Sequence, residues 1–134
     1  MNRRELREIL FQIVFQMDFH KENYREKSME YLEEQPLSSK DRVFSKRYLE
    51  NLCSNKDRID QEIVKHLRGW TLERLSKVDL AILRLATYEI LFEDEIPQNV
   101  SINEAVELSK RYSEDDSRKF INGVLDALSH GSKK

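Results

Sequence analysis

The sequence contains few glycines, prolines and cysteines, the residues that form turns, phosphate-binding loops, disulfides and many zinc sites. Its 134 residues include three glycines, two prolines and a single cysteine. With so few residues that favour turns, the chain is expected to form long helices joined by few turns. Three glycines leave no room for a glycine-rich phosphate-binding loop. The lone Cys53 excludes a disulfide within the chain and a cysteine-rich zinc site.

Long apolar runs are also missing. No stretch approaches the roughly 20 apolar residues that span a membrane. The charged N-terminus is not followed by the apolar core of a signal peptide. The sequence therefore predicts a cytoplasmic protein with no membrane partner.

Patterns of catalytic and metal-binding residues are missing as well. His20, His66 and His130 have no metal-motif spacing to one another or to Cys53. The acidic run at residues 93–95 could bind a cation, but such a run is typical of a solvated loop between helices. The sequence predicts no enzyme, no metal site and no cofactor.

Charged residues, by contrast, are plentiful. They make up 36% of the chain, against about 25% in typical globular proteins. The net charge is nevertheless −2, which argues against indiscriminate nucleic-acid binding, because such binding usually requires a basic domain. A nucleic-acid site in this chain must be local, or must be completed by a basic partner.

Every segment of the sequence is predicted to be helical. The expected helices cover residues 3–19, 24–35, 38–70, 78–92, 101–112 and 117–128. The helix over residues 38–70 has a possible break near residues 54 and 55. Gly69 is expected to stop the third helix. Ser101 and Glu104 have the spacing of a capping box, and Ser117 is the expected N-cap of the last helix.

The segment from Val78 to Phe92 is the expected centre of the fold. Its apolar residues point in every direction around the helix, which is typical of a buried helix. Asp79, Arg84 and Glu89 lie on the same helix. They must reach an edge or find partners, because a buried unpaired charge is very costly.

The first helix has two different faces. On a helical wheel an arc of about 100° contains the core residues Leu6, Ile9, Leu10, Ile13 and Met17. A second arc, nearly opposite, contains Arg4, Arg7, Phe11 and Phe15. Guanidinium groups for phosphates and rings for bases would suit a single-stranded nucleic acid. The alternative is that another part of the fold covers the two phenylalanines.

A second candidate site lies at the start of the last helix. Arg118 and Lys119 occupy its first turn, where cations oppose the helix dipole by about 0.3–1 kcal/mol each. Helix N-termini with exposed N–H groups also bind phosphates. The two cations therefore suggest a second anion-facing spot, with Phe120 beside them as a stacking ring or as a core residue.

The ordered motifs of the C-terminal half resemble a known family. Residues 70–128 contain "LSKVDLAILRLATYE", "INEAVEL" and "DDSRKFINGVLD", and they resemble the NusB family of bacterial transcription antitermination factors. The arginine-rich first helix is similar to the N-terminus of that family, and the resemblance is weak only across residues 20–60. It implies a single domain over residues 1–134, with an all-α fold of two three-helix bundles around a long central buried helix.

The resemblance also implies a function and partners. NusB-like proteins pair with NusE, a ribosomal protein, and the pair binds boxA-type single-stranded RNA in nascent ribosomal-RNA transcripts. This binding supports processive transcription, and other elongation factors and RNA polymerase are reached indirectly. A basic ribosomal protein would complete the RNA-binding surface of an acidic factor.

Carried over position by position, the resemblance implies individual contacts. The residues expected to bind RNA are Arg3, Arg4, Arg7, Phe15, Asp116 and Phe120, to which the helix-end argument adds Arg118 and Lys119. Asp79 matches an acidic position of the partner-binding surface. If both helix starts belong to one RNA track, Arg4 and Lys119 must share a surface.

Two positions depart from the family pattern. Glu5 interrupts the basic start, which implies weak RNA binding without a partner. Ser113 stands where relatives commonly have glycine, which leaves the backbone conformation of that turn open.

Two other functions stay open at this point. NusB-like modules also occur in ribosomal-RNA cytosine methyltransferases, so the chain could be a stand-alone RNA-binding module of that kind. A nucleotide-binding glycine motif is missing and the only cysteine is in mid-helix, which argues against the enzyme itself. The other alternative is a helical adaptor that binds a protein partner without contacting RNA.

Overall fold

The structure is a computed structural model that describes residues 1–132. These residues form seven α-helices and one short 3-10 helix, and they contain no strand. The all-α prediction is confirmed. The chain divides into two compact units, Met1–Asn55 and a second unit that begins at Lys56. The expectation of a single domain over residues 1–134 stays a prediction.

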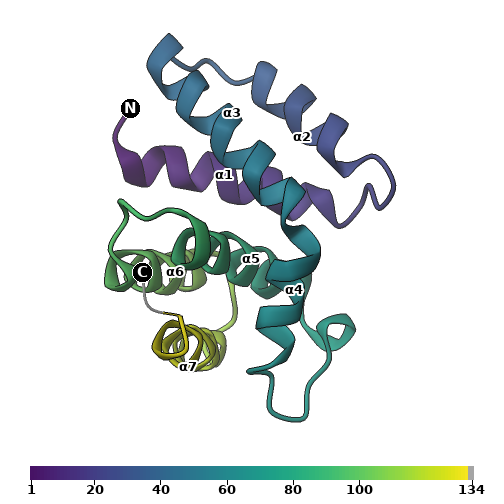
Figure 1. Cartoon of the computed structure of the whole chain (residues 1–134), viewed down its shortest axis with the longest axis vertical. Helices are drawn as coiled ribbons and strands as arrows, with labels where there is room; N and C mark the ends of the chain where they lie inside the picture. The colour runs from purple at the N-terminus through teal and green to yellow at the C-terminus, as the bar shows by residue number, and fades with distance from the viewer. Residues whose placement is uncertain (133–134) are drawn as a thin grey trace. The chain divides into compact units, whose positions relative to one another are not determined.

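The first unit contains three helices, α1 (Arg3–Met17), α2 (Tyr24–Glu33) and α3 (Ser39–Ser54). Helices α2 and α3 lie side by side, and α1 contacts both of them (Figure 1). The core face predicted for α1 is confirmed, because Leu6, Leu10, Ile13 and Met17 are all buried and Ile9 is half-buried.

Side-chain hydrogen bonds close the start of α1 and reach the end of α3. Asn2 accepts a hydrogen bond from the backbone N–H of Glu5 at 2.8 Å, and the Glu5 carboxylate accepts one from the backbone N–H of Asn2. This capping box satisfies two otherwise unpaired N–H groups. Glu5, which interrupts the basic start, therefore stabilises the start of α1. In the same unit the Tyr24 hydroxyl donates to the backbone oxygen of Cys53 at 3.4 Å.

The long third helix expected from the sequence is divided in two. Helix α3 ends at Ser54, and α4 (Lys56–Val64) follows after Asn55, so the predicted break is confirmed. The stop predicted at Gly69 is wrong, because α4 already ends at Val64. Gly69 lies in the following segment with a φ of 79°, a left-handed conformation that glycine adopts without steric cost.

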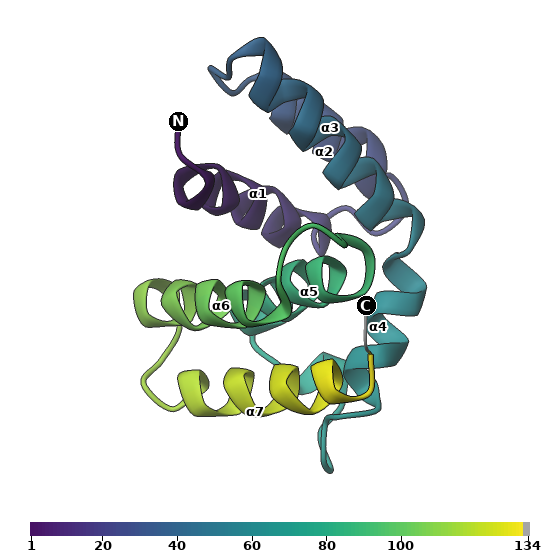
Figure 2. The ribbon, with the colours of Figure 1, turned by 60° about the vertical axis from the view of Figure 1, so that its left-hand side comes forward.

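The second unit is built around α5 (Lys77–Phe92). Its other elements are α4, the 3-10 helix η1 (Leu72–Arg74), α6 (Gln98–Tyr112) and α7 (Ser117–His130). Helix α5 contacts α4, α6 and α7, and α6 and α7 lie side by side (Figure 2). Every residue from Asp79 to Ile90 is buried, which confirms the central buried helix.

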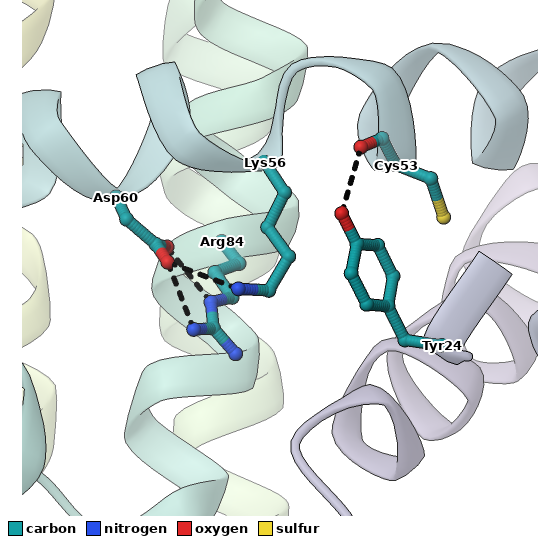
Figure 3. Close-up of polar contacts among 5 residues, drawn as sticks. All are labelled: Tyr24, Cys53, Lys56, Asp60 and Arg84. Atoms are coloured by element: carbon teal, nitrogen blue, oxygen red, sulfur yellow. Dashed lines mark hydrogen bonds and ion pairs between the residues drawn. The ribbon is translucent and has the colours of Figure 1, made fainter. Parts of the chain in front are cut away.

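The charged residues on α5 have the partners that their burial requires. The Arg84 guanidinium donates to both oxygens of Asp60, at 2.8 and 3.0 Å, and Lys56 reaches the same carboxylate at 3.3 Å (Figure 3). Glu89 accepts a hydrogen bond from the Ser101 hydroxyl at 2.8 Å. The capping box predicted for Ser101 is wrong, because α6 begins at Gln98 and Ser101 lies inside the helix.

Candidate nucleic-acid interface

The predicted arginine-rich surface begins at the N-terminus of α1. Arg3 and Arg4 are exposed. The Arg3 guanidinium carbon lies 3.9 Å from the centre of the Phe44 ring on α3, and that of Arg47 lies 5.3 Å from the same ring. A guanidinium over a ring face is attracted by the ring's electrons. Phe44 therefore holds two cations on one surface of the first unit.

Two residues of the same predicted face are not exposed to solvent. Arg7 is 6% exposed and Phe11 is 3% exposed. The prediction that Arg7 is exposed is wrong. For Phe11 the sequence left a core position and a surface position open, and the structure shows a core position. A helical wheel sorts the residues of one helix by direction, but only the packed chain decides how many directions are covered. A role for Arg7 in RNA binding stays a prediction.

The far end of α1 carries an aromatic pair. Phe15 is half-buried, and its ring contacts that of Phe19 edge to face at 5.4 Å between ring centres. Phe19 is 57% exposed. At 1.5 Å per residue, Phe15 lies about 16 Å along the helix from Arg4. Cations thus lie at the start of α1, and an accessible ring, that of Phe19, lies just beyond its end.

The start of α7 carries the second predicted site. Arg118 and Lys119 are exposed in its first turn. The N-cap is the exposed Asp116, whose side chain makes no capping hydrogen bond. The prediction of Ser117 as N-cap is therefore wrong by one residue. Both cations are available to an anion in solution, as the sequence predicted, but a contact with RNA stays a prediction.

Asp79 is an internal anchor as well as a candidate partner contact. Its side chain lies at the start of α5, where Ser76 caps the helix by accepting from the Asp79 N–H at 3.0 Å. One carboxylate oxygen accepts from the Ser113 hydroxyl at 2.6 Å and the other from the Ser117 hydroxyl at 2.8 Å. The residue is only 9% exposed. Asp79 therefore joins the start of α5 to the turn between α6 and α7.

The same geometry explains the departure at Ser113. Its φ is −105° and its ψ is 171°, an extended conformation that any residue adopts. Glycine is not required there. The serine hydroxyl supplies one of the two hydrogen bonds to Asp79, so the turn gains a contact that glycine could not provide.

Replacing Asp79 by lysine is expected to lower the stability of the fold, whereas a residue that only contacted a partner at the surface could be replaced without such a loss. The substitution removes the acceptor of two hydroxyl groups and places a cation in a nearly buried site. A loss of about 1–3 kcal/mol in the free energy of unfolding follows, measurable by urea denaturation. Asp79→Asn, which keeps one acceptor, should lose less. Equal stability of all three proteins would contradict the anchoring role.

Several predicted residues meet in one hollow of the second unit. Asp79, Asp116 and Phe120 line a hollow of about 300 Å³ together with Trp70 and Arg74. The Arg74 guanidinium carbon lies 5.1 Å from the centre of the Trp70 ring. Sequence reasoning missed both of these residues. The available signal was the sole tryptophan of the chain, which stands at the end of the helix predicted over residues 38–70 and outside its apolar stripe.

The structure does not test every part of the predicted interface. Arg4 belongs to the first unit and Lys119 to the second, so the single RNA track that joins them stays a prediction. Within residues 1–132, no group of three or more His, Cys, Asp and Glu side chains could hold a metal ion. No helix in that range is long and apolar enough to cross a membrane.

Fold and surfaces together define an all-α protein that exposes arginines and aromatic rings on each of its two units, a combination suited to nucleic-acid binding. The family profile of NusB matches residues 4–130. The transcription antitermination protein NusB of Clostridium botulinum (strain Kyoto / Type A2) is 45% identical over an alignment that covers 96% of this chain and 99% of that protein. The chain belongs to the NusB family.

Solved structures agree with this assignment. The structure of T. maritima NusB has a TM-score of 0.91 and 38% sequence identity, and the match covers 100% of this chain and 94% of that one. A crystal structure of the antitermination factors NusB and NusE in complex with dsRNA contains a chain with a TM-score of 0.83 and 28% identity, covering 96% of both chains. Fold and sequence thus point to the same family.

Proposed function

We propose that this chain is a non-catalytic transcription antitermination factor that binds boxA-type RNA of nascent ribosomal-RNA transcripts together with the ribosomal protein NusE. The complex supports processive transcription. The chain acts in the cytoplasm, where nascent transcripts form, and it reaches RNA polymerase and other elongation factors indirectly through the complex.

The proposal depends above all on the likeness of 96% of this chain to a chain in the crystal structure of NusB and NusE in complex with dsRNA. The exposed cations support it. Arg3 and Arg4 on α1, and Arg118 and Lys119 on α7, stand at helix starts where phosphate groups are favoured. Phosphate contacts of this kind position a strand, while the accessible rings contact its bases.

The charge of the chain supports the need for a partner. With 23 lysines and arginines against 25 acidic residues, its cations are local and its average surface is weakly acidic. A basic ribosomal protein adds positive charge beside these local sites and is itself attracted by the acidic factor. RNA binding is therefore weak for the chain alone and stronger for the pair.

A titration of labelled single-stranded boxA RNA with the chain, with and without NusE, tests this proposal. Fluorescence anisotropy should show tighter binding in the presence of NusE at every salt concentration. Affinity should also fall as salt rises, by about 0.7 logarithmic units per logarithmic unit of salt for each phosphate contact to single-stranded RNA. Equal affinity with and without NusE would contradict the partner-completed surface.

Variants of α1 sharpen the same experiment. Arg3→Ala combined with Arg4→Ala should weaken RNA binding and reduce the salt slope by roughly 1.4, two contacts at about 0.7 each. Both side chains are exposed, so the melting temperature should fall only slightly, through the loss of the contact between Arg3 and the Phe44 ring. Lys27→Ala is the matched control, since Lys27 on α2 pairs with Glu30 at 3.3 Å and lies outside the predicted surface.

A further inference from the structure

The second unit contains a groove that the predicted site residues only partly account for. Its volume is about 610 Å³, and it lies between the segment that follows α4 and the start and middle of α7. Its lining includes three cations, two large aromatic rings and one glycine: Lys65, Arg68, Lys119, Trp70, Phe120 and Gly123. We call it the Trp70 groove. No aspartate or glutamate lines it, although acidic residues outnumber lysine and arginine in the chain. Of its three cations, Lys65 also pairs with Glu62 on α4 at 2.8 Å, a contact exposed enough for a phosphate to share the lysine.

Trp70 gives the groove an accessible ring. It is 48% exposed, and it lines both this groove and the adjoining hollow that contains Asp116. Arg74 lies over the indole at 5.1 Å, a contact that holds the ring in place. A large exposed ring beside cations offers stacking area to an unpaired base, and every base has such a face.

Gly123 is an independent observation at the same place. It lies in the interior of α7, where glycine destabilises a helix relative to alanine. Its φ is not positive, and a Cβ atom built there would meet nothing within 4 Å. Neither backbone conformation nor packing within the described chain explains the glycine. Because Gly123 has no side chain, the space over this part of α7, inside the groove, is open.

We propose that the Trp70 groove binds a single-stranded segment of RNA. Phosphates contact Lys65, Arg68 and Lys119, and one base stacks on Trp70. The bare backbone at Gly123 lets the strand approach α7 closely. This inference rests on the proposed function, because the ligand is the same RNA, and it extends the predicted contacts of Lys119 and Phe120 to the segment between α4 and η1.

The sole tryptophan makes the groove directly observable. Titrating the full chain at low salt with single-stranded boxA RNA should quench the Trp70 emission in a saturable way, because a stacked base quenches the indole. The same sequence in duplex form should quench much less, since its base faces are already stacked. Quenching by a glutamate-rich peptide but not by RNA would overturn the proposal in favour of an acidic protein ligand.

Two variants separate binding from folding. Gly123→Ala should raise the melting temperature, because alanine is the better helix former, and yet bind labelled RNA several-fold more weakly. Asn122→Ala is its matched control, as Asn122 is exposed on α7 and does not line the groove. Trp70→Ala should fold normally and lose roughly 5- to 160-fold in affinity, which corresponds to the roughly 1–3 kcal/mol that one stacked base contributes.

The outcomes also separate this inference from the proposed function. If the wild-type chain with NusE binds boxA RNA while Gly123→Ala and Trp70→Ala bind equally well, the groove is not an RNA site and the proposed function stands. If the wild-type pair does not bind boxA RNA, the proposed function fails and the groove proposal fails with it.

Discussion

Leu85→Ala is expected to lower the free energy of unfolding by about 2–5 kcal/mol. Leu85 is 1% exposed in the middle of α5, the helix that contacts α4, α6 and α7. Truncation removes buried apolar surface and leaves a cavity that rigid neighbours fill only in part. Urea denaturation followed by circular dichroism measures the change.

A surface substitution in the same unit provides the control for Leu85. Val100 on α6 is 38% exposed, and Val100→Ala should change the free energy of unfolding by no more than about 0.5 kcal/mol. A loss below about 1 kcal/mol for Leu85→Ala would show that α5 is not the central packing element.

Asp60→Ala is expected to cost about 3 kcal/mol, the lower end for breaking a buried ion pair. The side chain of Arg84 is 5% exposed and that of Asp60 is 15% exposed. Without the carboxylate, the Arg84 guanidinium loses both of its hydrogen bonds to Asp60, and Lys56 remains as a nearby like charge (Figure 3). Burial prevents water from fully replacing the lost acceptor.

Two further variants test the origin of this cost. Asp60→Leu combined with Arg84→Met removes both partners of the bidentate pair, and it should be less destabilising than Asp60→Ala because the most deeply buried charge, the Arg84 guanidinium, is removed together with its acceptor. Glu62→Ala on the same helix breaks the pair of Glu62 with Lys65 at 2.8 Å, in which Lys65 is 63% exposed. Such a surface pair should contribute no more than about 1 kcal/mol. Equal costs for Asp60→Ala and Glu62→Ala would contradict the buried network.

Helix ends were less predictable than helix interiors. The central helix was visible because its apolar residues point in every direction. The ends at Gly69, Ser101 and Ser117 were misplaced because a cap is identified by a hydrogen bond to the backbone. Ser101 and Ser117 have hydroxyl groups that a cap would use, but these groups donate to Glu89 and Asp79 instead. Distant acceptors competed with the local ones, and spacing alone does not reveal them.

The candidate site was predictable only where exposure follows from position at a helix start. Arg3, Arg4, Arg118 and Lys119 are exposed as expected, because residues at the first turn of a helix have few neighbours. Arg7 and Phe11 lie one and two turns further along α1 and are buried. Trp70 escaped notice because it stands at the very end of the helix predicted over residues 38–70, outside the apolar stripe of that helix.

The sequence by itself determined the helices and the buried centre at α5, because helix periodicity depends on residue types at short spacing. It also determined that Arg84 and Glu89 need partners, because burying an unpaired charge is costly wherever the partner lies. Only the tertiary structure decided which residues meet those needs. Asp60 reaches Arg84 across 24 positions, and Ser113 and Ser117 reach Asp79 across 34 and 38. The Trp70 groove likewise joins residues 65–70 to residues 119–123. Contacts at such separations depend on how helices pack, and no local pattern encodes them.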